Sequence, residues 1–288
     1  KIDKLKEKQK KLKKKTEEKE SKTEDLIKEQ EKLQEDLDKL KEDLKKLEEQ
    51  NKELEQLTYI TSHNLQEPLR MIGSFSQLLQ MRYKGKLDKQ ADDFISFITE
   101  GSKRMQVLLN DVSIYSNISR NTSDISLVNT KKVLNNCLKQ LSTSIKESKT
   151  TITFDKLPNV AINEAEMQQL FHHLISNSIK YRCKDKKNKI HVSVELHEEN
   201  EWFFAIKDNG IGIEAEYCEK IFRVFSRLHT YNNYKGTGIG LAICQKIVGK
   251  YGGKIWVDTQ QIEGCTFYFS LPLPTQNYVN MTTSHQIV

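Results

Sequence analysis

The chain has 288 residues, which is long enough for two or three small structural units. Basic residues exceed acidic ones by a formal net charge of +6. No basic stripe with interleaved aromatic residues occurs, so the composition argues against a nucleic-acid partner. No run of about 18 apolar residues is present, which argues against a membrane-spanning helix.

The five cysteines are widely spaced and include no C-x-x-C pair. This pattern argues against a zinc site or a disulfide framework and favours a reducing, cytoplasmic location. No signal peptide is visible. Because the chain begins with Lys1, we expect a fragment that lacks an upstream sensor or membrane domain. The location could then be the cytoplasmic portion of a membrane-bound sensor.

Residues 1–57 contain no aromatic residue, Gly or Pro. Leucines from Leu5 to Leu54 occupy one heptad position, broken only by Lys19, and Asn51 occupies the second core position. Such a pattern predicts a parallel two-stranded coiled coil. At 1.5 Å per residue the helix would be about 85 Å long. The alternative is a single, solvated, charged helix.

Residues 58–120 predict a helical hairpin. One helix continues to about Tyr83, a connection with Gly85 follows, and a second amphipathic helix runs from Asp88 to about Asn117. A single hairpin buries too little surface to be stable alone. Two copies would form a dimeric four-helix bundle, so we expect a homodimer.

Residues 121–274 predict a mixed α/β domain, and residues 275–288 a loose tail. The expected strands are Ile125–Val128, Thr151–Phe154, Lys189–Leu196, Trp202–Lys207, Lys254–Asp258 and Thr266–Leu271, and the expected helices are Thr130–Glu147, Glu164–Lys180 and Gly240–Tyr251. The complete chain is therefore expected to be an α+β multidomain protein.

Three motifs carry chemistry. The first is His63 in the first hairpin helix, where Pro68 removes a helical hydrogen bond and should bend the helix nearby. A lone helical histidine is usually an ordinary surface or core residue, so this motif needs support from the others.

The second motif is a pair of glycine runs, Asp208–Ile213 after a strand and Gly236–Leu241 at the start of a helix. Glycines let backbone N–H groups approach phosphates, and a helix N-terminus favours an anion. The third motif lies on one helical face and consists of His173, Asn177, Lys180 and Tyr181. An amide oxygen can ligate Mg²⁺ and an ammonium group can meet phosphate, although a solvated helix face would look similar.

From His63 to Leu271 the sequence resembles the catalytic core of sensor histidine kinases. The resemblance is to the phytochrome-like branch, in HNLQEPLR, ISNSIKYR, KDNGIGI, IFRVFSRLH, GTGIGLAICQKIV and GGKIWV. It implies a HisKA-type dimerisation domain and a two-layer α/β sandwich of the GHKL, or Bergerat, ATPase fold. It also implies ATP and Mg²⁺ as cofactors, and a response-regulator receiver domain in trans as partner.

The same resemblance implies a role for each site residue. His63 would be the phospho-acceptor, with Asn64 and Glu67 beside it in the catalytic helix, and Asn177 would bind the metal. A lid, Ser226–Lys235, would close over the triphosphate. The residues implied to bind the nucleotide are Asn177, Lys180, Tyr181, Asp208, Gly210, Gly212, Phe225, Arg227, Gly236, Thr237, Gly238, Gly240, Leu241 and Thr266.

Three positions depart from the family pattern. Asn64 stands where most members carry an acid, so we expect slower autophosphorylation because an amide is not a base. Glu67 replaces Thr or Asn, which predicts weak phosphatase activity. His173 replaces an Asn, which changes the second contact to the metal.

Two rival functions remain open from the sequence. One is a related GHKL-type ATPase that hydrolyses ATP to drive conformational change and needs no His63. The other is a non-catalytic, nucleotide-binding dimeric scaffold, which Asn64 and His173 would suit.

Overall fold

The computed structural model describes residues 2–118, 125–197, 200–228, 234, 236–259 and 263–273, with side chains in the first helix described at Gln30 and from Lys32 onward. The tail 275–288 and most of the expected lid lie outside these residues. The chain divides into two compact units, Lys1–Leu57 and Thr58–Val288. None of the described helices has a stretch both long and apolar enough to cross a bilayer.

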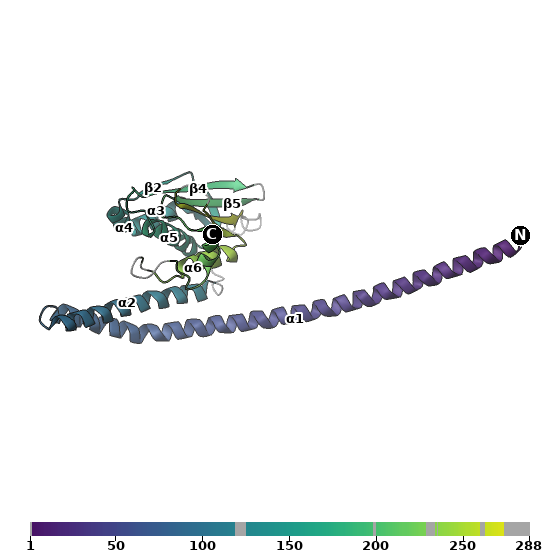
Figure 1. Ribbon diagram of the computed structural model, residues 1–288, viewed down its shortest axis with the longest axis horizontal. Helices are drawn as coiled ribbons and strands as arrows, with labels where there is room; N and C mark the ends of the chain where they lie inside the picture. The colour runs from purple at the N-terminus through teal and green to yellow at the C-terminus, as the bar shows by residue number, and fades with distance from the viewer. Residues whose placement is uncertain are drawn as a thin grey trace, which may run out of the picture. The chain divides into compact units, whose positions relative to one another are not determined.

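The first unit belongs entirely to helix α1, which spans Ile2–Tyr83 without interruption (Figure 1). Leu33, Leu40, Leu47 and Leu54 are between 62% and 67% exposed. Exposed leucines do not stabilise a single helix, because apolar surface is stabilising only when it is removed from water. The coiled coil therefore stays a prediction that requires a second chain.

Helices α1 and α2 (Lys89–Asn117) form the predicted hairpin. The Asp88 side chain caps α2 by accepting a hydrogen bond from Ala91 N at 2.7 Å. Gly85 turns the chain with a φ of +73°, which disfavours a side chain there. Pro68 lies inside α1, and the helix continues through it.

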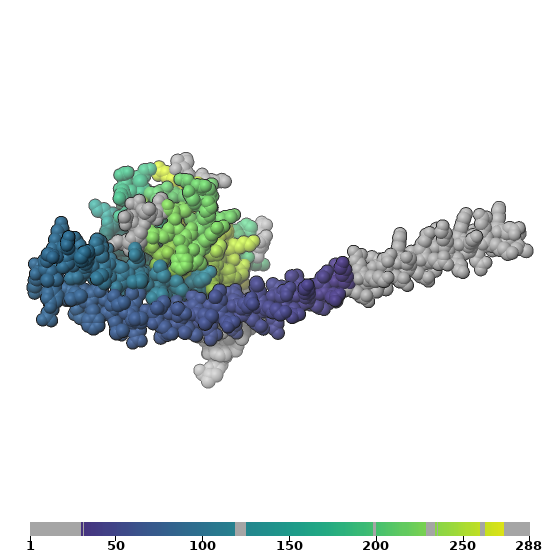
Figure 2. Space-filling model, turned by 60° about the horizontal axis from the view of Figure 1, so that its bottom comes forward, coloured from purple at the N-terminus to yellow at the C-terminus, as the bar shows by residue number. Residues whose placement is uncertain are grey.

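Small side chains form the seam between α1 and α2, which lie side by side in both views (Figures 1 and 2). Ser76, Thr99 and Ser102 are buried. A Cβ added to Gly73 would lie 3.0 Å from Gln106 Nε2. Leu69 is also buried, whereas most large apolar residues of the hairpin are exposed, including Phe75 at 65% and Phe97 at 69%.

Residues after the hairpin form two sheets. The larger has the strand order β2-β4-β5-β7-β6, in which β2 and β4 pair in parallel and the other pairs are antiparallel. The smaller pairs β1 with β3. The strands are β1 Ser126–Asn129, β2 Thr151–Phe154, β3 Asn159–Ile162, β4 Lys189–His197, β5 Glu201–Asp208, β6 Ile255–Asp258 and β7 Cys265–Pro272.

Helices pack against the larger sheet to give a two-layer α/β sandwich (Figure 1). They are α3 Thr130–Gln140, α4 Ser142–Ser148, α5 Glu164–Lys180 and α6 Gly240–Lys250, with short 3₁₀ turns at Ala215–Tyr217 and Lys220–Phe222. Phe171 of α5, Phe204 of β5 and Phe269 of β7 are fully buried at the centre of the core. The rings of Phe204 and Phe269 stack at 4.8 Å.

Two expectations about these elements were wrong. The single helix Thr130–Glu147 is divided at Leu141, which has φ −84° and ψ 5° and is buried. Ser142 and Thr143 follow this position at the start of α4, and both have lower helix propensity than Ala, Leu or Lys. Strand β3 was not expected, because it forms by pairing with β1, which is distant in the sequence.

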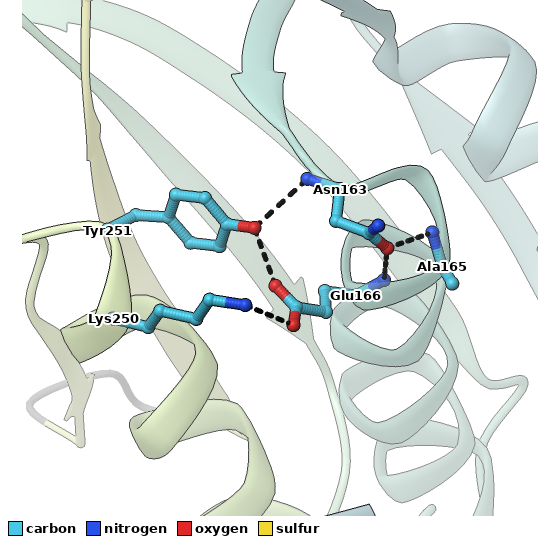
Figure 3. A network of polar contacts seen from close by, with 5 residues as sticks. All are labelled: Asn163, Ala165, Glu166, Lys250 and Tyr251. Carbon is cyan, nitrogen blue, oxygen red and sulfur yellow. Dashed lines mark hydrogen bonds and ion pairs between the residues drawn. The ribbon is translucent and has the colours of Figure 1, made fainter. Parts of the chain in front are cut away.

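A buried polar network joins the start of α5 to the end of α6 (Figure 3). Glu166 is 7% exposed and accepts hydrogen bonds from Lys250 Nζ at 2.7 Å and Tyr251 Oη at 2.6 Å. Tyr251 Oη also accepts from Asn163 N at 3.0 Å, and Asn163 Oδ1 caps α5 by accepting from Ala165 N. The network fixes the ends of the two helices that carry the site described next.

Candidate nucleotide site

A cavity of about 330 Å³ opens between α5, the end of β5, the glycine run before α6 and helix α2. It brings together residues from both glycine runs and from the polar face of α5, as predicted. The predicted residues that line it are Asn177, Lys180, Tyr181, Asp208, Gly212, Arg227, Gly236, Thr237, Gly238, Gly240 and Leu241.

Three residues expected in the site do not line this cavity. Phe225 is 58% exposed, with a φ of +63°. Thr266 is 2% exposed, and its neighbours Cys265 and Phe267 line the cavity instead. Side chains alternate along a strand, so Thr266 of β7 points to the other face of the sheet. Gly210 lines a neighbouring cavity.

Asp208 ends β5 with its carboxylate at the edge of the cavity. It accepts hydrogen bonds from Ser178 Oγ at 2.8 Å and from Gly210 N at 2.9 Å, with Cys265 Sγ at 3.7 Å. Burial raises the pKa of Asp208, and these donors oppose that rise. The result is a fixed acceptor suited to a neutral N–H donor such as a purine amino group.

The loop after Asp208 is held close to its neighbours. Asn209 accepts from Lys189 N at 2.7 Å and donates to the carbonyl of Lys187 at 3.0 Å. A Cβ at Gly210 would lie 2.6 Å from the carbonyl oxygen of Tyr181, and one at Gly264 would lie 2.0 Å from that of Asp208. Only glycine fits at both positions.

Two cationic side chains line another part of the cavity. Burial, together with the charge of Arg227, lowers the pKa of Lys180 from its ordinary 10.5 to about 8. The Lys180 Nζ lies 4.4 Å from the centre of the Tyr181 ring, and Arg227 donates to the carbonyl of Tyr234 at 3.2 Å. Two like charges in one cavity repel each other, and a bound anion would relieve this repulsion.

The second glycine run leaves space beside Lys180 and His173 that a side chain on these glycines would fill. A Cβ at Gly236 would lie 2.7 Å from Lys180 Nζ, and a Cβ at Gly240 would lie 2.8 Å from His173 Nδ1. No side chain in the described part of the chain caps helix α6, which begins at Gly240. Its first backbone N–H groups are therefore available to an anion.

His173 is neutral at physiological pH, because burial lowers its pKa to about 4, with a smaller effect from His172. It cannot supply a positive charge for phosphate. It lines the cavity one helical turn from Asn177. The described residues contain no cluster of three or more His, Cys, Asp or Glu side chains that could hold a metal ion.

Sequence reasoning missed several residues of the cavity wall, among them residues from α2 and β7. Val107 and Asp111 come from α2, and Cys265 comes from the start of β7. Alternation along β7 could have identified Cys265 from its neighbour. No local signal identifies Asp111, because it meets residues 126 positions away in the sequence.

The predicted catalytic residues lie outside the cavity, on the part of α1 that belongs to the hairpin. His63, Asn64 and Glu67 are all exposed, and the ring of His63 lies 6.4 Å from that of Tyr59. An exposed imidazole is accessible to a reacting group.

Comparisons with known proteins agree with this geometry. Residues 162–275 match the family model described as histidine kinase-, DNA gyrase B-, and HSP90-like ATPase. Cyanobacterial phytochrome A from Nostoc sp. strain PCC 7120 is 43% identical over 218 residues, which cover 76% of this chain and 28% of that protein. The chain therefore spans little more than a quarter of that relative.

Two solved structures share the fold. Full-length ShkA in complex with AMPPNP has a TM-score of 0.61 at 20% identity, covering 76% of this chain and 46% of that chain. The histidine kinase ThkA in complex with the response regulator protein TrrA has a TM-score of 0.51 at 23% identity, covering 76% of this chain and 61% of that chain.

The fold and the site thus define a histidine kinase-type ATPase domain preceded by a helical hairpin. More particularly, residues 162–275 belong to the histidine kinase-, DNA gyrase B-, and HSP90-like ATPases, and the chain is similar to histidine kinase catalytic cores such as the kinase region of cyanobacterial phytochromes.

Proposed function

We propose that this chain is an ATP-dependent protein histidine kinase that phosphorylates its own His63 and then passes the phosphoryl group to an aspartate of a response regulator. The observation that carries the proposal is the cavity, which joins Asp208, Lys180 and the uncapped start of α6. This arrangement suits a purine at one end and a polyphosphate at the other. The exposed His63 supplies the acceptor.

In the proposed reaction, the neutral imidazole Nε2 of His63 attacks the γ-phosphorus of ATP. A nitrogen–phosphorus bond forms, the bond to the ADP oxygen breaks, and the imidazole loses the proton on its other nitrogen to water. Lys180 and Arg227 offset the charge that moves toward ADP, and the backbone of α6 holds the phosphates in place. Asn64 can orient the imidazole but cannot remove its proton.

Mg²⁺ fits this site as a partner of ATP. Asn177 offers an amide oxygen in the cavity wall, and the neutral His173 can hydrogen-bond to a metal-bound water. A bound Mg²⁺ would supply neutralisation of the phosphate charge. A single protein ligand is enough when substrate phosphates provide others.

The same proposal includes a parallel homodimer. The seam between α1 and α2 contains small residues, whereas Phe75, Phe94 and Phe97 are each more than 60% exposed. Exposed apolar surface of this kind marks an interface. A second hairpin would cover it and form a four-helix bundle. Residues 1–57 of two chains would pair through their exposed leucines in a coiled coil, which would transmit a signal from an upstream sensor.

The proposal is tested by measuring acid-labile phosphate on the protein. Purified protein with Mg²⁺ and γ-labelled ATP should acquire label that is stable in base and lost in acid. His63→Gln should remove that label, because an amide is not a nucleophile. His197→Gln, which changes another exposed histidine, should keep it.

Label that persists in His63→Gln would contradict the assignment of the acceptor. ATP hydrolysis without any protein-bound label would favour the related ATPase instead. Nucleotide binding with neither label nor hydrolysis would favour a non-catalytic scaffold. Transfer of the label to a receiver domain tests the second step.

A further inference from the structure

Asp111 of α2 lies in the wall of the nucleotide cavity, although the proposed chemistry has no use for an anion there. Thr237 Oγ1 donates a hydrogen bond of 2.6 Å to Asp111 Oδ2. Thr237 belongs to the glycine run that precedes α6. The hairpin helix is therefore bound directly to the loop expected to hold phosphates.

A second contact reinforces the first, one helical turn further along α2. Lys246 Nζ of α6 lies 4.4 Å from the centre of the Tyr115 ring, a distance typical of a cation–π interaction. Ile114 and Val112 of α2 also pack against the core of the ATPase domain. We call the Asp111–Thr237 and Tyr115–Lys246 pairs the α2 latch.

Thr237 cannot donate its hydroxyl hydrogen bond to Asp111 and to a polyphosphate at the same time. The Thr237 hydroxyl has one proton, which it gives either to Asp111 or to a phosphate oxygen. A carboxylate and a phosphate in the same partly buried cavity repel each other more strongly than they would in water. Burial already raises the pKa of Asp111, which shows that its charge is poorly solvated there.

We infer that the α2 latch is an autoinhibitory contact that a polyphosphate nucleotide opens. In the latched state Asp111 accepts the hydrogen bond that Thr237 can donate, and it places a negative charge beside the start of α6. Nucleotide binding displaces the carboxylate and frees the ATPase domain from α2. The inference rests on the proposed function, because it requires a nucleotide in this cavity.

Thermodynamic linkage makes the effect reciprocal. If latching weakens nucleotide binding by some factor, nucleotide weakens latching by the same factor. Coupling of this kind between sites commonly amounts to roughly 5- to 150-fold. Asp111→Asn removes the charge while keeping an oxygen that can accept from Thr237, so it separates repulsion from loss of packing.

Calorimetric titration of the complete chain with AMP-PNP and Mg²⁺ tests the inference. Asp111→Asn should bind AMP-PNP about tenfold more tightly than the unaltered chain. Glu100→Gln removes one negative charge from an exposed position on the same helix and should leave the affinity unchanged. Adenosine has no phosphates, so its affinity should change little in Asp111→Asn.

Hydrogen exchange in residues 106–117 reports the latch itself. AMP-PNP should raise exchange there, and Thr237→Val should raise it without nucleotide. Equal AMP-PNP affinity in Asp111→Asn and the unaltered chain, or exchange that nucleotide leaves unchanged, would overturn the latch while the proposed kinase stands. Failure of every variant and of the unaltered chain to bind AMP-PNP would remove the proposed function, and the latch with it.

Discussion

At the scale of a single residue, Lys180 is expected to make nucleotide binding depend on pH. Its pKa is lowered to about 8, so its ammonium is mostly charged at pH 7 and mostly neutral at pH 9. The charge is thus present below this pKa and is lost as pH rises through it. We expect the KM for ATP in autophosphorylation to rise roughly three- to tenfold between pH 7 and pH 9.

Lys180→Arg provides the control, because a guanidinium stays charged throughout this range. Its KM should change little between pH 7 and pH 9. A KM profile for Lys180→Arg as steep as that of the unaltered enzyme would assign the pH dependence to another group. The phosphates of ATP do not account for it, since any further ionisation adds negative charge as pH rises and would strengthen, not weaken, binding to a cation.

The site residues that belong to one local sequence motif could be predicted from the sequence. Lys180 and Asn177 share a helical face by spacing alone, and Asp208 ends a strand. Asp111 could not be predicted, because its place in the cavity depends on how α2 packs against α6. Thr266 was placed in the site from the family motif, and strand alternation puts Cys265 there instead.

At the scale of elements, the Glu166 network holds α5 and α6 together. Lys250→Met should lower the free energy of unfolding by about 1–3 kcal/mol, because it leaves a buried carboxylate with one fewer donor. Urea denaturation followed by circular dichroism measures this loss. Lys146→Met, on the exposed face of α4, should change stability by less than about 0.5 kcal/mol.

Tyr251→Phe tests the other half of the network. It removes a donor to Glu166 and an acceptor for Asn163 N, so a loss of about 1 kcal/mol or more is expected. If Lys250→Met and Tyr251→Phe were both as stable as Lys146→Met, the network would not contribute to stability.

Elements with a long, regular pattern could be predicted from sequence. Helix α5 has the expected bounds, and α2 begins one residue after its expected start, Asp88. Strand β3 could not be predicted, because four residues are stabilised here by pairing with β1 and by burial of Val160 and Ile162. Such tertiary pairing leaves little trace in a short sequence.

At the scale of the whole molecule, the outward apolar face of the hairpin predicts how the protein associates. Phe97→Glu should raise the dimer dissociation constant at least tenfold, because burying a phenylalanine contributes about 1.5–3 kcal/mol. Sedimentation velocity measures the change. Lys103→Glu, also exposed on α2, should leave association nearly unchanged, and equal behaviour of both variants would refute this face as the interface.

The single parallel strand pair, β2 with β4, has a consequence for the order of folding. Antiparallel neighbours such as β4 and β5 need only a short turn, whereas β2 and β4 are joined by a crossover that contains β3 and all of α5. Closing so long a connection costs chain entropy before its contacts form, which makes such pairings slow. Because α5 carries Asn177 and Lys180, the nucleotide site should assemble late, after the antiparallel strands have formed.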